Sequence, residues 1–284
     1  MKKSTLIALI VATALSVFGF VLALTVFAVN HFDVQMFERE ALIEKPYTVE
    51  EAFSSIDIDT DTASVTLLPA TDGVCRVVCV EEADYPYDIE VRNGTLFIEG
   101  TADFYDFTHL FAIHFRTPSI TLYLPEDTYE SLKVTVTTGD VRVDSAFTFE
   151  NAHIKSTTSD AFFEADVRDS LSIGVTTGDV TLSHMTCKTA SITVTTGDVE
   201  LTHVTASGKL TVKTTTGDVE LERSDAAELD ISTTTGDVEG SLLSGKSFDC
   251  RTTTGDISYP NNSTGGKCRI RATTGDIDIT VIGK

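Results

Sequence analysis

Positive charge is scarce in this sequence. Its 284 residues include 21 lysines and arginines against 43 aspartates and glutamates, which gives a formal net charge of −22. Because phosphate recognition needs clustered lysine and arginine, the composition argues against nucleic acid as a partner. Gly-x-Ser-x-Gly, P-loop and His-Glu-x-x-His motifs are also missing, and the acidic residues recur regularly along the chain. We therefore expect a protein that is not an enzyme.

Cysteines are few and form no recognisable framework. The five are odd in number and show no Cys-x-x-Cys spacing, which argues against a zinc site and a disulfide scaffold. Cys75 and Cys79 lie four residues apart in a strand-like run, roughly 13 Å in a straight strand and too far for a disulfide. Cys250 and Cys268 fall in apolar columns of the repeat described below, so we expect both to be buried thiols.

Charge is absent altogether from residues 5–29. As a helix this stretch would span about 37 Å, more than the roughly 30 Å of a bilayer's hydrocarbon core. The apolar region of a cleaved signal peptide is only about 7–15 residues long, so an uncleaved anchor is favoured and cleavage after Ala28 is the alternative. Lys2 and Lys3 precede the stretch, and the positive-inside rule places residues 1–4 in the cytoplasm. The rest of the chain is then expected outside a single-pass cell membrane.

Helical periodicity is missing after residue 31, and a tetrad recurs there every 19 or 20 residues. The tetrad Thr-Thr-Gly-Asp ends at Asp140, Asp179, Asp198, Asp218, Asp237, Asp256 and Asp276, and a variant, Thr-Thr-Ser-Asp, ends at Asp160. Numbered from the glycine, positions −7, −5, +2 and +4 are mostly apolar and alternate with polar residues, which is the pattern of half-buried strands. The repeat predicts an all-β, single-stranded, β-helix-like solenoid of about eight coils, preceded by one transmembrane helix.

The tetrad itself predicts the corner between two strands. Glycine there can adopt a positive φ, and aspartate can hydrogen-bond its own backbone. We expect the paired threonines to form strand ladders, with an ice-binding array as the alternative. The corner glycines are Gly139, Gly178, Gly197, Gly217, Gly236, Gly255 and Gly275.

The chain divides into residues 1–4, an anchor at 5–29, a linker at 30–51, an irregular β cap at 52–130 and the solenoid at 131–284. Five of the six prolines precede residue 130, residues 54–70 resemble a degenerate copy of the repeat, and Asn93-Gly94 predicts a hairpin. An aromatic insertion at 100–118 is expected to cover the open end of the core, or else to contact a partner or the membrane. The last coil ends at Lys284 without a cap, which predicts an edge open to homo-oligomer formation.

The outward columns contain the candidate ligands. Aspartate occupies +1 in every copy and an acidic residue occupies +3 in four copies, so coils about 4.8 Å apart would stack like charges. A weak Ca²⁺ site would relieve the repulsion. The residues concerned are Asp198, Glu200, Asp218, Glu220, Asp237, Glu239, Asp276 and Asp278. We favour the other interpretation, that each aspartate satisfies its own turn and no cofactor binds, because the nonapeptide of calcium β-rolls is absent. His184 and His203 share position +6 and could hold a transition metal, although exposed loop histidines are expected.

The segments IDIDTDTASVTL, NGTLFIEG and ITLYLPED, followed by repeated TTGDV, resemble the bacterial putative-adhesin β-strand-repeat family, a domain of unknown function. The resemblance covers about residues 50–284 and departs from the family at Gly100–Pro118 and Ser159. It implies an N-terminal anchor, a cell-envelope location and a β-solenoid, and it brings no catalytic residues.

Together the residues and the resemblance predict a membrane-anchored, extracytoplasmic, non-enzymatic binding or adhesion module, whose partner is an envelope polymer or protein. The first alternative is a structural or envelope-stress signalling accessory protein that self-associates through the solenoid edge. The second is a carbohydrate-active enzyme.

Overall fold

The computed structural model describes Val17 and residues 19–21, 42–82, 85–100, 117–261 and 264–283. The chain splits into two compact units, and the larger one contains all the strands found among the described residues. Most of the predicted anchor and residues 101–116 of the aromatic insertion lie outside the described residues. No helix within the described ranges is long and apolar enough to cross a membrane.

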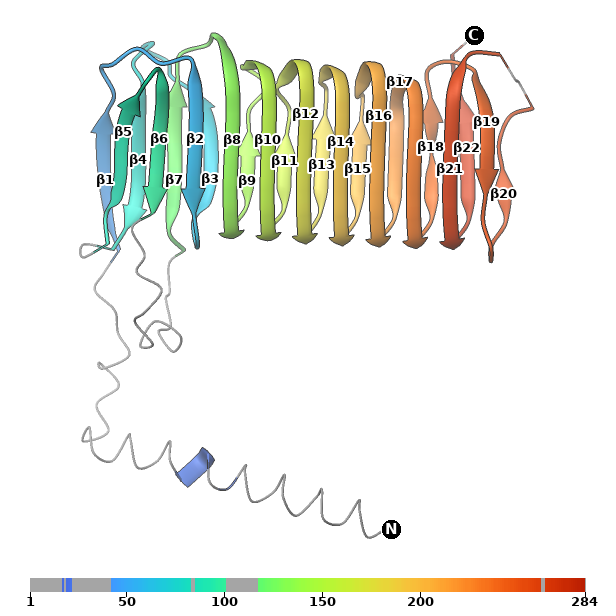
Figure 1. The fold of residues 1–284 in the computed structure, drawn as a ribbon, viewed down its shortest axis with the longest axis horizontal. Coiled ribbons are helices and arrows are strands. Elements are labelled where there is room, and N and C mark those ends of the chain that lie inside the picture. Colours follow the sequence, from blue (N-terminus) through green and yellow to red (C-terminus); the bar gives the residue numbers. More distant parts are fainter. Residues whose placement is uncertain are drawn as a thin grey trace. The chain divides into compact units, whose positions relative to one another are not determined.

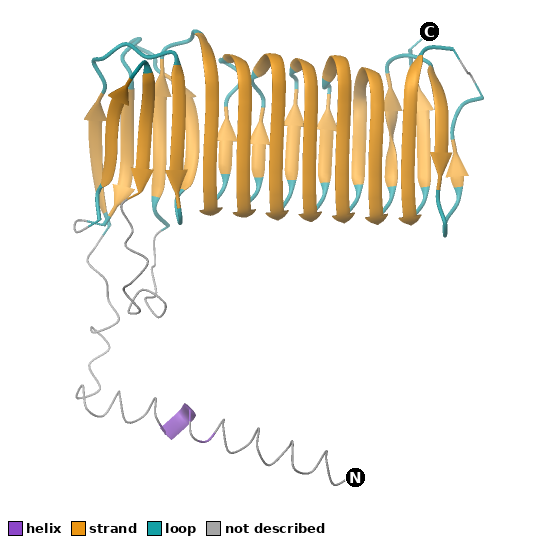
Figure 2. Cartoon of the chain, in the orientation of Figure 1, coloured by secondary structure: helices purple, strands orange, loops and turns teal. Residues whose placement is uncertain are grey.

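The larger unit is all-β and consists of two facing sheets built by successive turns of the chain (Figures 1 and 2). In spatial order, one sheet, called here the long-strand sheet, contains β5 (Tyr87–Arg92), β6 (Thr95–Gly100), β2 (Ser55–Thr60), β8 (Thr128–Thr138), β10 (Thr148–Thr158), β12 (Asp166–Thr177), β14 (Thr186–Thr196), β16 (Thr205–Thr216), β17 (Val219–Thr235), β21 (Gly266–Thr274) and β19 (Lys246–Arg251).

The other sheet is called here the short-strand sheet. It contains β1 (Ile43–Thr48), β4 (Arg76–Glu81), β7 (Ser119–Leu124), β3 (Ser64–Pro69), β9 (Val141–Val143), β11 (Ala161–Phe163), β13 (Val180–Ser183), β15 (Val199–Thr202), the first part of β17, β18 (Val238–Leu242), β22 (Ile277–Val281) and β20 (Ile257–Ser258). Repeats stack in parallel and in register, so the solenoid prediction is confirmed in its β architecture.

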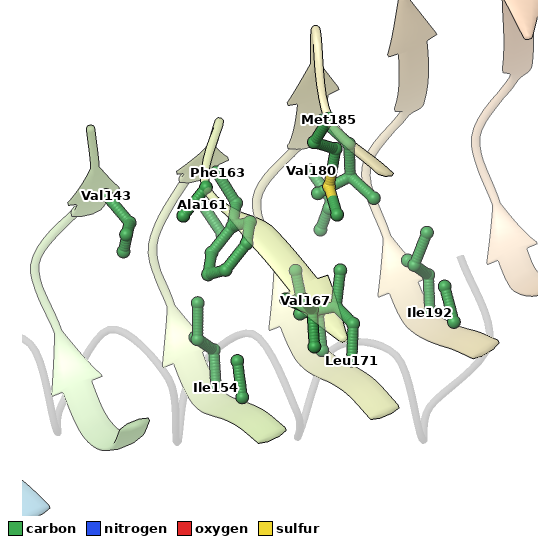
Figure 3. Close-up of a cluster of buried hydrophobic side chains, with 14 of the residues drawn as sticks. Val143, Ile154, Ala161, Phe163, Val167, Leu171, Val180, Met185 and Ile192 are labelled. Carbon is green, nitrogen blue, oxygen red and sulfur yellow. The ribbon is translucent and has the colours of Figure 1, made fainter. Parts of the chain in front are cut away.

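The apolar columns of the repeat form one continuous core between the sheets. In the −5 column Ile154, Ile173 and Ile192 are at most 1% exposed, and in the +2 column Val180 is fully buried. Figure 3 shows such side chains from both sheets meeting in the interior, with Phe163 among them. Side chains alternate between the two faces of a strand, so the period-2 pattern alone places these columns inside.

The corner glycines are required by both conformation and space. Gly197 has a φ of 139°, and a Cβ added to it would lie 2.0 Å from the carbonyl oxygen of Gly178 on the preceding coil. Such a position excludes every side chain, because the φ is strained for L-residues and the stacked backbone leaves no room. In the variant corner, Ser159 takes the place of the glycine. Its side chain is buried, and its hydroxyl donates a hydrogen bond to the hydroxyl of Ser156.

The N-terminal end of the two sheets consists of antiparallel strands. β1 pairs with β4, β4 pairs with β7, and β5 pairs with β6. Asn93 and Gly94, with φ values of 52° and 76°, form the turn between β5 and β6, which confirms the predicted hairpin. Residues 54–70 contribute β2 and β3 as one coil, as their resemblance to the repeat predicts.

The coils at both ends stack out of sequence order. β2 lies between β6 and β8, and β3 lies between β7 and β9. At the other end, β21 lies between β17 and β19, and β22 lies between β18 and β20. The last coil in sequence is therefore internal, so the prediction of an open edge at the coil ending at Lys284 is wrong. The open edge belongs to the preceding repeat, formed by β19 and β20.

Candidate functional site

The corner aspartates form a hydrogen-bonded ladder between coils. The backbone N–H of Asp198 donates to Oδ1 of Asp179 at 2.8 Å, and the same bond joins Asp218 to Asp198 at 2.8 Å. The N–H of Asp237 likewise donates to Asp218 at 2.7 Å. Beyond Asp237 the ladder follows the spatial order of the coils: the N–H of Asp276 donates to Asp237, and the N–H of Asp256 donates to Asp276. The carboxylates thus accept from the next coil rather than from their own turn, which corrects the predicted partner.

The acidic residues at +3 line up on the outer face of the short-strand sheet. Glu200 lies beside Glu220, Glu220 beside Glu239, and Glu239 beside Asp278. We call these four residues the acidic row. Its neighbours are polar and uncharged at both ends, with Thr181 before Glu200 and Ser258 after Asp278.

The predicted Ca²⁺ site stays a prediction. In the described part of the chain, no group of three or more His, Cys, Asp or Glu residues is arranged to hold a metal ion. In the four corner aspartates of the predicted site, Asp198, Asp218, Asp237 and Asp276, one carboxylate oxygen already accepts a backbone hydrogen bond from the next coil. The row concentrates negative charge without enclosing it, which suits diffuse attraction of cationic groups.

His184 and His203 are stacked neighbours, as their shared position predicts. Their ring centroids are 4.9 Å apart with an interplanar angle of 10°. Both have a positive φ, 52° and 56°, and so does Arg223 at 48° in the next coil, which identifies the column as a second left-handed corner. Parallel rings direct their nitrogen lone pairs side by side rather than toward one point, so the pair is poorly arranged to chelate a metal.

The five cysteines are free, and four are buried. Burial raises the pKa of Cys79 and Cys268 to about 12 and the pKa of Cys187 to about 11, so these groups stay protonated at neutral pH. Cys250 is only half-buried, which corrects its predicted burial, because its coil is the terminal one.

Sequence reasoning missed a buried ion pair that bridges non-adjacent strands. Lys246 on β19 is 3% exposed, and its Nζ lies 2.5 Å from Oδ1 of Asp225 and donates to the carbonyl of Ala226 at 2.7 Å. The side chain passes β21 at Gly266, where an added Cβ would lie 1.9 Å from the carbonyl oxygen of Ala227. No sequence signal could reveal the pair, because the contact exists only in this coil order.

Sequence reasoning also missed the basic residues on the outer face of the long-strand sheet. Arg271 on β21 lies 2.5 Å from Asp249 and holds the pKa of that carboxyl below its ordinary value. On the same face Lys209 bonds Asp230 at 2.9 Å. In these repeats, the outer face of the long-strand sheet thus has paired charges of both signs, and that of the short-strand sheet has the acidic row.

Comparison with known proteins finds likenesses in family and in structure. A family model described as Toastrack DUF4097 matches residues 53–211 and residues 165–284. A putative adhesin from Bacteroides fragilis NCTC 9343 aligns with a TM-score of 0.51 at 16% identity, over 85% of this chain and 97% of that chain. A putative adhesin from Parabacteroides distasonis ATCC 8503 aligns with a TM-score of 0.42 at 14% identity, over 84% and 97% of the two chains.

A putative lipid binding protein from the same Parabacteroides strain aligns with a TM-score of 0.38 at 12% identity, over 84% of this chain and 96% of that chain. Of these three structures, only the Bacteroides protein has a TM-score above 0.5, and it supports the fold. No curated protein matches the chain.

Proposed function

The chain belongs to the Toastrack DUF4097 family, and on that basis we propose that it is a membrane-anchored binding module of the cell envelope that works without catalysis. Residues 5–29 anchor it in the cell membrane with residues 1–4 in the cytoplasm, and the solenoid lies outside. The partner is an envelope polymer or protein that contacts an extended face rather than a single pocket.

The observation that carries the proposal is the acidic row. Four carboxylates, on Glu200, Glu220, Glu239 and Asp278, follow one another on adjacent strands of a regular sheet. With strands about 4.8 Å apart, the row extends over roughly 14 Å. A repeated charge at this spacing favours a ligand that is itself repetitive and cationic, such as an amine-bearing polymer or a lysine-rich protein surface.

Co-sedimentation of the full chain, kept in mild detergent, with cell-envelope fragments from which the membranes have been extracted tests the proposal. We expect the protein to pellet with the fragments, and we expect added salt to weaken this binding because exposed charges are screened within about 8 Å at 0.15 M. Neutralising the acidic row with Glu→Gln at 200, 220 and 239 and Asp278→Asn should reduce the pelleted fraction severalfold.

A control variant with the same change in net charge shows whether binding depends on the acidic row or on the net charge of the protein. Gln in place of Glu50, Glu51, Glu126 and Glu130 removes four exposed carboxylates away from the row. This variant should pellet like the wild type. Equal losses in both variants would show that net charge alone drives binding, and pelleting of neither the wild type nor the control would contradict the proposed function.

A further inference from the structure

The terminal coil leaves apolar side chains open at one end of the solenoid. Within the described residues, β19 pairs only with β21, and β20 pairs only with β22. Ile257 and Tyr259 of this coil are 41% and 40% exposed, whereas Ile277 and Ile279, in the same columns of the adjacent coil, are 1% and 2% exposed. The core columns of the repeat thus end at a partly uncovered surface.

We propose that this end binds the same end of a second copy of the chain, by antiparallel pairing of β19 with β19 about a two-fold axis at Cys250. An edge strand presents unpaired backbone groups that accept another strand, and a two-fold interface requires a self-complementary surface. The inference is independent of the envelope ligand proposed above.

The directions in which the side chains of β19 point limit the registers that two copies of the strand can adopt. Inward residues must stay opposite inward residues, so the axis must pass through a residue of β19 and not between two residues. With the axis at Asp249, two aspartates would face each other, and with the axis at Arg251, two arginines would. Only the axis at Cys250 places each Asp249 opposite Arg251 of the second copy, which gives two attractive cross-strand pairs.

Arg251 is exposed enough to leave its partner within the chain and pair with Asp249 of the second copy. Arg251 is 74% exposed, and its Nε lies 3.4 Å from Oδ1 of Asp249 within the chain. The same carboxylate is held from the other side by Arg271 at 2.5 Å, which fixes it on the outer face of the strand. Cys250 and Phe248, on the inner face, are half-buried; in this register Cys250 would be covered by Cys250 of the second copy, and Phe248 would lie opposite Thr252.

The association should be weak in free solution. A six-residue strand is about 20 Å long and facing sheets lie about 10 Å apart, so the end offers a cross-section of only a few hundred Å². Stable interfaces bury about 800 Å² on each partner, and a charge of −22 on each copy adds repulsion. The dimer should therefore form at protein concentrations of about 100 µM and above, and added salt should favour it.

Disulfide trapping of the full chain in mild detergent tests the register. Directly opposed residues of an antiparallel pair have Cα atoms about 4.5–5.5 Å apart, within the range that a disulfide bridges. Diamide treatment, which oxidises two thiols to a disulfide and is itself reduced to the hydrazine, should convert the wild type to a covalent dimer. Cys250→Ser should stay monomeric on a non-reducing gel, and Cys187→Ser should dimerise like the wild type.

A charge variant distinguishes specific pairing from random collision. Arg251→Glu places like charges opposite each other in both cross-strand pairs and changes an exposed side chain, so its thermal unfolding should match the wild type. Its rate of disulfide formation should fall at least tenfold. An equal rate in Arg251→Glu, or dimers that persist in Cys250→Ser, would overturn the proposal, as would a wild type that remains monomeric by sedimentation at 500 µM.

Discussion

Replacing the corner glycine Gly197 by alanine should destabilise the solenoid strongly. The added Cβ would lie 2.0 Å from the carbonyl oxygen of Gly178 and 2.6 Å from its carbonyl carbon. Both contacts are with backbone, so no side chain can rotate away to relieve them. The φ of 139° adds a conformational cost of about 1–3 kcal/mol.

Clash and conformation together should cost about 3–5 kcal/mol, because the corner can relieve the contact only by separating two hydrogen-bonded coils. For a unit of this size, 1 kcal/mol shifts the unfolding midpoint by about 2–4 °C. We therefore expect Gly197→Ala to unfold about 6–20 °C below the wild type, measured by circular dichroism at the β-sheet minimum.

Gly174→Ala is the matched control. Gly174 lies within β12, and a Cβ added to it meets nothing within 4 Å. Alanine there should be neutral or stabilise by a few tenths of a kcal/mol, because it restricts the unfolded chain. If Gly197→Ala unfolds within 2 °C of Gly174→Ala, the argument that stacking requires glycine at the corner is refuted.

Three further predictions concern the buried pair, the thiols and calcium. Asp225→Ala should lower the free energy of unfolding in urea by about 3 kcal/mol, because it leaves the buried Lys246 charged without its partner. Adding Lys246→Met should recover part of this loss. A larger loss in the double variant would contradict the pairing. Burial raises the pKa of thiols such as Cys79 from about 9 in the unfolded chain to about 12, so unfolding releases protons at high pH. The free energy of unfolding should therefore be constant below pH 9 and fall as the pH rises from about 9 to 12. A flat profile that Cys79→Ala leaves unchanged would count against this. Millimolar Ca²⁺ should shift the unfolding midpoint by less than 1 °C, and a larger shift that disappears on neutralising the acidic row would favour the cation site.

The sequence was sufficient to predict the features that repeat. Alternation around each tetrad places Ile173 and Val180 inside, and Asn93-Gly94 marks its hairpin, because these depend on local geometry and burial alone. The order of the end coils could not be predicted, because every coil has nearly the same length and the same inward columns. Residues outside the period fit only the observed order, among them Lys246 and Gly266.

The same ambiguity explains the errors at the candidate site. Whether Asp256 bonds its own turn or the neighbouring coil depends on how the corners are offset, which no single repeat reveals. Cys250 shares its column with buried isoleucines, and it is half-exposed only because another coil takes the interior place. The acidic row could be predicted as a column, but its continuity from Glu239 to Asp278 follows from the inserted coil.

The stacking order of the last coils decides both the acidic row and the open end, and paired cysteines measure it directly. In the structure Glu239 lies beside Asp278, whereas stacking in sequence order would place Glu239 beside Ser258. Neighbouring strands lie close enough for a disulfide between facing cysteines. The full chain with Glu239→Cys and Asp278→Cys should form an intramolecular disulfide on oxidation, and the chain with Glu239→Cys and Ser258→Cys should not. The reverse result would contradict the inserted coil, the continuous acidic row and the open end at β19.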